Sequence, residues 1–249
     1  MTALTVGITT ARFATCKRGL AVNLAAIRAR EVTGSRVCVV DADPRSLDVT
    51  TRFGVRGPYL EDFAEQVVSA DDLASVHEPP LWVVPSADAG VGLAYEGAAR
   101  ALPRLRRDFD LVICDVLGGP AGPARVLGRL EQLDWLLVAV TPDVEPVETA
   151  VRFLAQFDEA LRRGDVASSV RVGIVTTGDE GSTDLSSEVV GRALGRPVVG
   201  SIRQLWGRTA PNLGFGAALG IEELEASVGS LFERLGHQGA RNTASSRSS

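Results

Sequence analysis

Short apolar runs alternate with helical patterns along almost the whole chain. The apolar runs, rich in valine, isoleucine and leucine, lie at 4–9, 36–41, 81–85, 110–115, 134–141, 171–176 and 197–202. Most are continuously apolar, as in strands that are covered on both faces. The helical patterns lie at 19–31, 59–68, 91–108, 121–132, 145–163, 183–194 and 220–235. This alternation predicts an α/β fold with a three-layer, doubly wound, mostly parallel sheet.

Length and composition indicate a single folded unit. With 249 residues, of which 45% are hydrophobic, the chain can bury one large core. We expect one domain over 1–236 and a disordered, polar, serine-rich tail over 237–249. The three cysteines are too few for a disulfide framework. Two of them, Cys38 and Cys114, lie inside strand-like runs and are expected to be buried thiols.

Charge and hydropathy restrict the choice of partners. The formal net charge of -5 gives no strong indication of nucleic-acid binding. One arginine-rich segment, 100–107, is interpreted as the solvated end of a surface helix. No apolar run approaches the roughly 18 residues that a membrane span needs, and no signal-peptide pattern precedes the first strand. We therefore expect a cytoplasmic protein.

Lys17 is the only lysine in the chain, and the other 25 of the 26 basic residues are arginines. It follows the apolar run at 4–9 and precedes the helical pattern at 19–31. A strand, a loop ending in lysine and a helix form the layout of a phosphate-binding P-loop. A lysine provides a compact charge on a flexible stem, which suits it to reach terminal phosphates.

Two further strands end in aspartate. The run at 36–41 ends in Asp41, with Asp43 two residues later, and the run at 110–115 ends in Asp115. Ligands of open parallel sheets bind at the carboxyl ends of the strands. P-loop enzymes hold the magnesium shell with an aspartate at the end of an apolar strand. The lysine loop and the aspartates together predict a nucleotide site at this edge.

On these residues the chain resembles the ParA/MinD family of deviant Walker A P-loop ATPases, over about 3–236. The segments that carry the resemblance are 21–26 (AVNLAA), 39–44 (VVDADP), 109–115 (FDLVICD) and 140–143 (VTPD). The spacing from 81–86 to 107–110 is most similar to the MinD-like branch that includes the CpaE and TadZ pilus-localisation factors. The resemblance implies the P-loop NTPase fold, a homodimer and ATP or ADP as cofactor.

The loop departs from the family pattern KGGxGK[ST], because residues 12–18 read RFATCKR. Three glycines, which let the loop approach phosphates closely, are replaced by Phe13, Ala14 and Cys16. Arg18 replaces the hydroxyl that ligates magnesium, and a guanidinium cannot coordinate a cation. A degenerate P-loop of this kind predicts weak ATP binding, impaired or absent hydrolysis, and a poor magnesium site.

The resemblance also assigns roles to individual residues. The nucleotide-binding residues that it implies are Arg12, Cys16, Lys17, Arg18 and Gly19. It implies that Asp41 helps to position the attacking water and that Asp115 holds magnesium through a water molecule. Both carboxylates are expected to be exposed strand ends that contribute little to stability.

The leading functional hypothesis is a diverged, cytosolic positioning or partition-type factor that acts through dimerisation and an unknown protein partner. Arg12 corresponds to the family lysine that crosses the dimer interface, and Phe13 either anchors a dimer or plugs the phosphate site. One alternative is an active ATPase with an unorthodox Arg/Lys loop. Another is an anion- or redox-sensing regulator centred on Cys16, because cations and a helix N-terminus lower the pKa of a thiol.

Membrane attachment has little support from the sequence. MinD proteins carry a basic amphipathic segment at the extreme C-terminus. Here the last helical pattern contains four glutamates, and a polar tail follows it; the glutamates are Glu222, Glu223, Glu225 and Glu233.

Overall fold

A computed structural model gives the fold of the chain. It describes residues 3–11, 15–43, 48–65, 68–76, 80–87, 91–116, 118, 132–165, 169–178, 185–203 and 226–236. The calls on Arg12, Phe13, Ala14 and the tail at 237–249 lie outside these residues.

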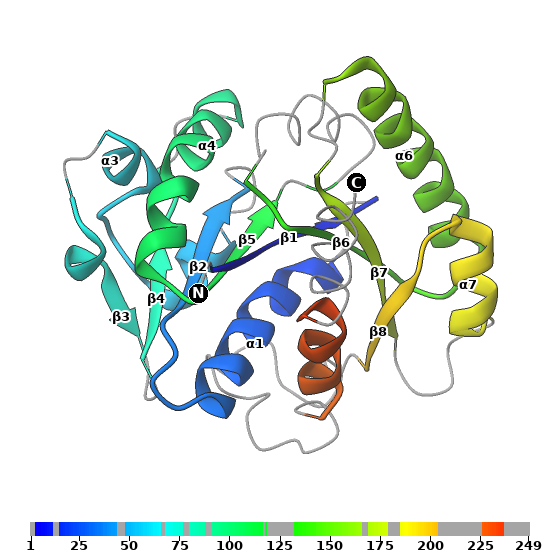
Figure 1. Ribbon diagram of the computed structural model, residues 1–249, viewed down its shortest axis with the longest axis horizontal. Coiled ribbons are helices and arrows are strands. Elements are labelled where there is room, and N and C mark those ends of the chain that lie inside the picture. The colour runs from blue at the N-terminus through cyan, green and yellow to red at the C-terminus, as the bar shows by residue number, and fades with distance from the viewer. Residues whose placement is uncertain are drawn as a thin grey trace, which may run out of the picture.

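The centre of the fold is one sheet with the strand order β3-β4-β2-β5-β1-β6-β7-β8 (Figure 1). The strands are β1 (Leu4–Thr10), β2 (Val37–Ala42), β3 (Ala74–Val76), β4 (Leu81–Val84), β5 (Leu111–Val116), β6 (Trp135–Val140), β7 (Arg171–Gly178) and β8 (Val198–Arg203). Only the short edge strand β3 is antiparallel to its neighbour among the described strands. The predicted doubly wound, mostly parallel sheet is confirmed.

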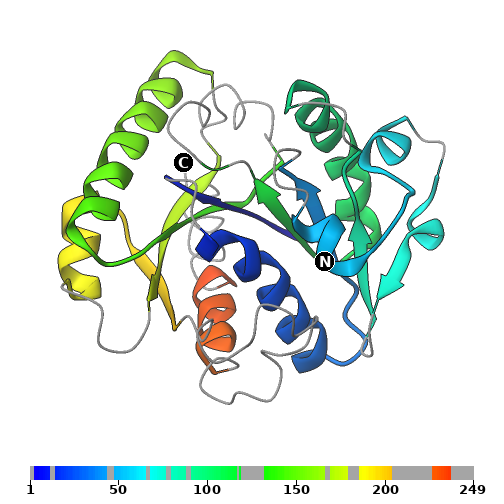
Figure 2. The ribbon, with the colours of Figure 1, turned by 180° about the vertical axis from the view of Figure 1, so that it is seen from behind.

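Helices cover both faces of this sheet (Figures 1 and 2). They are α1 (Thr15–Glu31), α2 (Asp48–Phe53), α3 (Leu60–Ala64), α4 (Val91–Asp108), α6 (Val144–Arg163), α7 (Ser187–Leu194) and a last helix over 226–236. A 3-10 turn spans Ala70–Asp72. The helices α1 and 226–236 lie on one face, and α3, α4, α6 and α7 lie on the other.

The side-chain alternation of each strand divides the core into two layers. In β2, Val37 and Val39 belong to the cluster that contains the α1 side chains. Cys38 and Val40 belong to the cluster that contains α4 and α6. The strands are buried on both faces for this reason, which explains their continuously apolar sequences.

Most predicted elements are present, with shifted ends. The first helix begins at Thr15 instead of residue 19, so Lys17 lies in its first turn. The helix predicted at 59–68 ends at Ala64, and α2 and β3 were not predicted. Most of the predicted helix at 121–132 lies outside the described residues.

The interpretation of the arginine-rich segment as a solvated helix end is wrong for two of its side chains. Arg104 donates hydrogen bonds to the carbonyl oxygens of Phe63 and Val68, at 2.7 and 3.3 Å. Arg106 forms an ion pair with Asp134 at 3.2 Å. These arginines tie α4 to neighbouring segments and are not available as an open basic patch.

Candidate functional site

The two predicted aspartates meet at the carboxyl edge of the sheet. Asp41 on β2 and Asp115 on β5 are direct register partners, and Asp115 is also paired with Ile8 of β1. Asp41 lies two positions after Val39, and Asp115 lies two positions after Ile113. Side chains two positions apart on a strand point to the same face, so both carboxylates lie on the face that α1 covers. The sheet therefore brings together the ends of β1, β2 and β5, as the motifs predicted.

The expectation that these carboxylates are exposed is wrong. Both Asp41 and Asp115 have 0% relative exposure. Further polar residues at the same edge are buried too, which shows that the ends of these strands are covered; they are Thr9, Thr10, Asp43 and Ser86. Ionised groups in such a position need hydrogen-bond partners or compensating charge.

Asp41 receives its partners mainly from α2. The Oδ2 atom accepts hydrogen bonds from the amide of Thr50 at 2.9 Å and from its hydroxyl at 2.7 Å. The Oδ1 atom accepts a longer one, 3.4 Å, from the amide of Asp43. In turn, the amide of Ser86 donates to the Thr50 hydroxyl at 3.3 Å. Asp41 thus links β2 to the first turn of α2 and, through Thr50, to the end of β4.

Burial is the main influence on the protonation of Asp41. It raises the pKa of this carboxyl above the ordinary value of 3.8, and the hydrogen bonds from Thr50 and Asp43 oppose the increase. The nearby Asp43 carboxylate adds a smaller repulsion that also raises the pKa. The bonds from Thr50 are therefore what favours the charged form inside the protein.

The cysteines of the sheet are free, buried thiols, as predicted. Burial, and secondly the charge of Asp115, raise the pKa of Cys114 to about 12. Burial likewise raises the pKa of Cys38 well above its ordinary value. Both thiols stay protonated at neutral pH and are poor nucleophiles.

The first turn of α1 lies directly after β1, where a P-loop helix begins. The helix starts at Thr15, and Gly19 is buried in it. The backbone of Cys16, Lys17 and Arg18 belongs to this turn, and their side chains lie outside what the structure describes. Free amides and the helix dipole make such a turn favourable for an anion.

The residues of this edge fit a phosphate better than a magnesium ion. The helix start and Lys17 supply donors and positive charge for an anion. In the family pattern that the sequence resembles, Arg18 stands at the position of the magnesium-ligating hydroxyl, and a guanidinium repels a cation. Over the residues that the structure describes, no group of three or more histidine, cysteine, aspartate or glutamate side chains could hold a metal ion.

Solved structures with the same architecture identify the fold. MinD of Aquifex aeolicus superposes with a TM-score of 0.69 at 18% identity, covering 94% of this chain and 97% of that one. McdA of Cyanothece superposes with a TM-score of 0.67 at 20% identity, covering 94% and 99%. MinD of Pyrococcus horikoshii, solved with Mg-ADP, gives 0.67 at 15% identity, covering 92% and 94%.

The chain has the fold of the ParA and MinD ATPases. No protein-family model matches the sequence, and no curated protein matches it. At identities of 15 to 20%, the structural similarity establishes the ParA/MinD-type architecture that the motifs indicated. No helix in the described parts of the chain has the length and apolar character to cross a membrane.

Sequence reasoning missed Thr50, which donates two hydrogen bonds to Asp41, and Ser86, whose amide donates to the Thr50 hydroxyl. Thr50 lies in a helix of six residues that has no clear periodicity, and Ser86 follows the end of β4. The only sequence signal for Ser86 is its place after a strand, next to the edge where the other polar residues gather.

Proposed function

We propose that the chain is a diverged ParA/MinD-type protein that acts as a positioning or partition-type factor, through dimerisation and binding of a protein partner. In this proposal ATP binds weakly and hydrolysis is impaired or absent. The observation that carries it is a combination: the sheet edge and helix start of a P-loop site are retained, whereas residues 13, 14, 16 and 18 are not those of a working loop.

The retained part of the site supports binding of an anion. Asp41 and Asp115 are neighbours on adjacent strands and both are buried. A buried carboxylate on each of two adjacent strands needs hydrogen bonds or positive charge close to it. In the proposal the loop cations Arg12, Lys17 and Arg18 supply this charge, and a bound phosphate would share them.

The altered part of the site supports the loss of hydrolysis. Metal charge neutralisation is a large part of phosphoryl-transfer catalysis, and Arg18 removes a magnesium ligand. In the family pattern, Asp41 helps to position water and Asp115 holds the metal through a water molecule; we propose that they retain these positions without an efficient metal centre. The cofactor is then ATP or ADP, bound with little dependence on magnesium.

Calorimetric titration of the protein with ATP and ADP, with and without magnesium, tests this proposal. We expect weak binding whose affinity changes less than about threefold when magnesium is added, since the metal ligand is missing. A variant with Arg18→Thr and with residues 13, 14 and 16 changed to glycine should gain magnesium-dependent affinity. Adding Lys17→Ala to that variant provides the control and should remove the gain.

Two results would contradict the proposal. The first is magnesium-dependent turnover at the rate of an active ATPase, which would show that the Arg/Lys loop works as it stands. The second is the absence of any nucleotide affinity in both the natural and the restored protein, which would show that the scaffold has lost the site. Sedimentation of the natural protein and of the Arg12→Glu variant tests the dimer. We expect the Arg12→Glu substitution to weaken self-association.

A further inference from the structure

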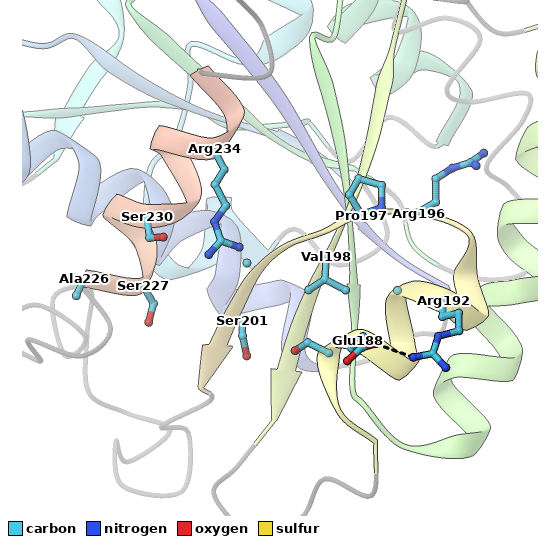
Figure 3. A pocket seen from close by; sticks show the side chains of 13 residues that line it. Glu188, Arg192, Arg196, Pro197, Val198, Ser201, Ala226, Ser227, Ser230 and Arg234 are labelled. Atoms are coloured by element: carbon cyan, nitrogen blue, oxygen red, sulfur yellow. Dashed lines mark hydrogen bonds and ion pairs between the residues drawn. The ribbon is translucent and has the colours of Figure 1, made fainter. Parts of the chain in front are cut away.

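A groove runs along the last strand of the sheet, far from the aspartates. It has a volume of about 740 Å³ and lies between α7 and the helix 226–236, with β8 along its floor (Figure 3). In the sheet order, β6 and β7 separate β8 from β1. The groove is therefore a different surface from the proposed nucleotide site.

The walls of the groove carry an excess of positive charge. Among the described residues, its lining includes three arginines, Arg192, Arg196 and Arg234, and one carboxylate, Glu188; the Arg196 side chain turns away from the groove, toward Asp158 (Figure 3). In a chain with a formal net charge of -5, this is a local reversal of sign. Serine side chains also line the groove, Ser201 from the strand and Ser227 and Ser230 from the last helix (Figure 3).

The arginines already hold carboxylates or carbonyl oxygens in this chain. Arg192 forms an ion pair with Glu188 at 2.7 Å, with both side chains strongly exposed at 73% and 83%. Arg196 is paired with Asp158. The exposed Arg192 pair contributes little to stability, so this guanidinium group can exchange its partner at low cost, whereas Arg196 is only 27% exposed and stays with Asp158. The planar fork of arginine suits a carboxylate in particular.

The floor of the groove has the properties of a strand edge. β8 is the last strand in the order of the described sheet, and β7 is its neighbour there. The register shifts by one residue between Ile174 and Val175, which leaves Val199 as the extra residue of a bulge. Arg234 reaches the carbonyl oxygen of Val199 at 3.5 Å, so a wall arginine lies directly over the strand.

We propose that this groove binds an acidic, extended peptide segment of a partner protein, which adds to the edge of β8 and places its carboxylates on Arg192 and Arg234. Strand addition to an open edge gives affinity through main-chain hydrogen bonds, and side-chain contacts give specificity. The arginine walls select negative charge and increase the association rate. This inference does not depend on nucleotide binding, because the groove and the loop are separate.

Fluorescence anisotropy with a defined probe tests this docking site. The probe is a labelled eight-residue peptide in which pairs of glutamates alternate with pairs of threonines, so that an extended chain presents carboxylates on both of its sides, toward α7 and toward the last helix. Two control peptides carry glutamine in place of glutamate, or N-methyl groups on alternate amides. We expect the full-length protein to bind the acidic peptide at least about tenfold more tightly than either control.

Matched variants of the protein locate the site. Arg192→Gln and Arg234→Gln should each weaken binding of the acidic peptide, by about tenfold for the second. Arg162→Gln is the control, because Arg162 is 71% exposed and also forms an ion pair within its helix, with Glu159, outside the groove. It should change the affinity less than twofold. Since Arg192 is largely exposed, its replacement leaves the fold intact even if Arg234→Gln proves unstable.

Each contrary outcome overturns the proposal. Equal binding of the glutamine peptide excludes the charge selection, and equal binding of the N-methylated peptide excludes strand addition. Equal effects of Arg162→Gln and Arg192→Gln show that only overall charge matters. If an eight-residue oligothymidylate binds more tightly than the acidic peptide and loses affinity in the Arg234→Gln variant, the groove is a nucleic-acid site. No binding of any probe excludes the proposed occupant.

Discussion

Thr50 provides the sharpest test of how the carboxyl edge is built, because a single hydroxyl separates two descriptions of Asp41. In the first, Asp41 is a strand-end carboxylate with little structural importance. In the second, it is a buried group that depends on hydrogen bonds from α2. Thr50→Val removes the hydroxyl that lies 2.7 Å from Oδ2 of Asp41 and keeps the hydrogen bond from the backbone amide of residue 50, at 2.9 Å. The shape of the side chain and its helix propensity change little.

The geometry sets the size of the effect. A hydrogen bond to a charged group contributes about 1.5–3 kcal/mol to stability, and Asp41 is fully buried. The amide of Ser86 also loses its acceptor, which lies at 3.3 Å. We expect Thr50→Val to lower the free energy of unfolding by about 2 kcal/mol. For a domain of this size that corresponds to a decrease of about 4–8 °C in melting temperature.

Thermal and denaturant unfolding measure this loss. Thr51→Val is the control, since Thr51 is the next residue of the same helix and is exposed. It makes the same chemical change and should cost less than about 0.5 kcal/mol. In an Asp41→Ala background, Thr50→Val should cost little, because its acceptor is already absent. Equal, small losses for both threonines would refute the structural role of Asp41.

Three further predictions concern Asp41 and two other parts of the buried core. Burial raises the pKa of Asp41 above 3.8, so the folded protein binds the proton of this carboxyl more tightly than the unfolded chain does. The group therefore lowers the stability of the protein as the pH rises through its folded pKa. Asp41→Asn should flatten that part of the plot of stability against pH. Gly173→Ala should reduce the free energy of unfolding by about 1–3 kcal/mol, since its Cβ would lie 2.9 Å from a branched methyl of Val199, and a melt without change contradicts this. A thiol reagent should label neither buried cysteine until the protein unfolds, which mass spectrometry can follow; they are Cys38 and Cys114.

The sheet could be predicted because its strands are apolar on both faces. The observed strand ends differ from the predicted ones by one or two residues, and the helix predicted at 91–108 has the same bounds as α4, Val91–Asp108. Helix periodicity needs a window of about 11–18 residues, which α2 with six residues does not provide. The short β3 has three residues and pairs with β4 in the opposite direction. Elements of this length form through tertiary contacts, which no local pattern records.

The sequence predicted where Asp41 and Asp115 lie in the fold, but it did not predict that they are buried. Each of these aspartates stands at the end of an apolar run. Since parallel strands end at the same edge of a sheet, this position predicts that Asp41 and Asp115 meet there. Their burial depends on the cover provided by α1 and by α2, and the second of these was not predicted. The start of α1 at Thr15 was missed because the apolar stripe that predicted this helix, Leu20, Leu24 and Ile27, begins only after its first turn.

The structural role of Asp41 does not remove its proposed catalytic role, and Asp41→Asn can separate the two. Oδ2 is used by Thr50, whereas Oδ1 accepts one long bond of 3.4 Å and keeps capacity for a further donor such as water. The asparagine carbonyl can still accept the bonds from Thr50, but its amide group replaces Oδ1 and cannot accept. If Asp41 positions water, this variant of the restored-loop protein should lose at least about tenfold in ATP turnover, or about 1.4 kcal/mol of barrier stabilisation. Its melting temperature should not fall below that of its parent, because asparagine carries no charge that burial penalises. Loss of stability without loss of turnover would instead show that Asp41 only supports the fold.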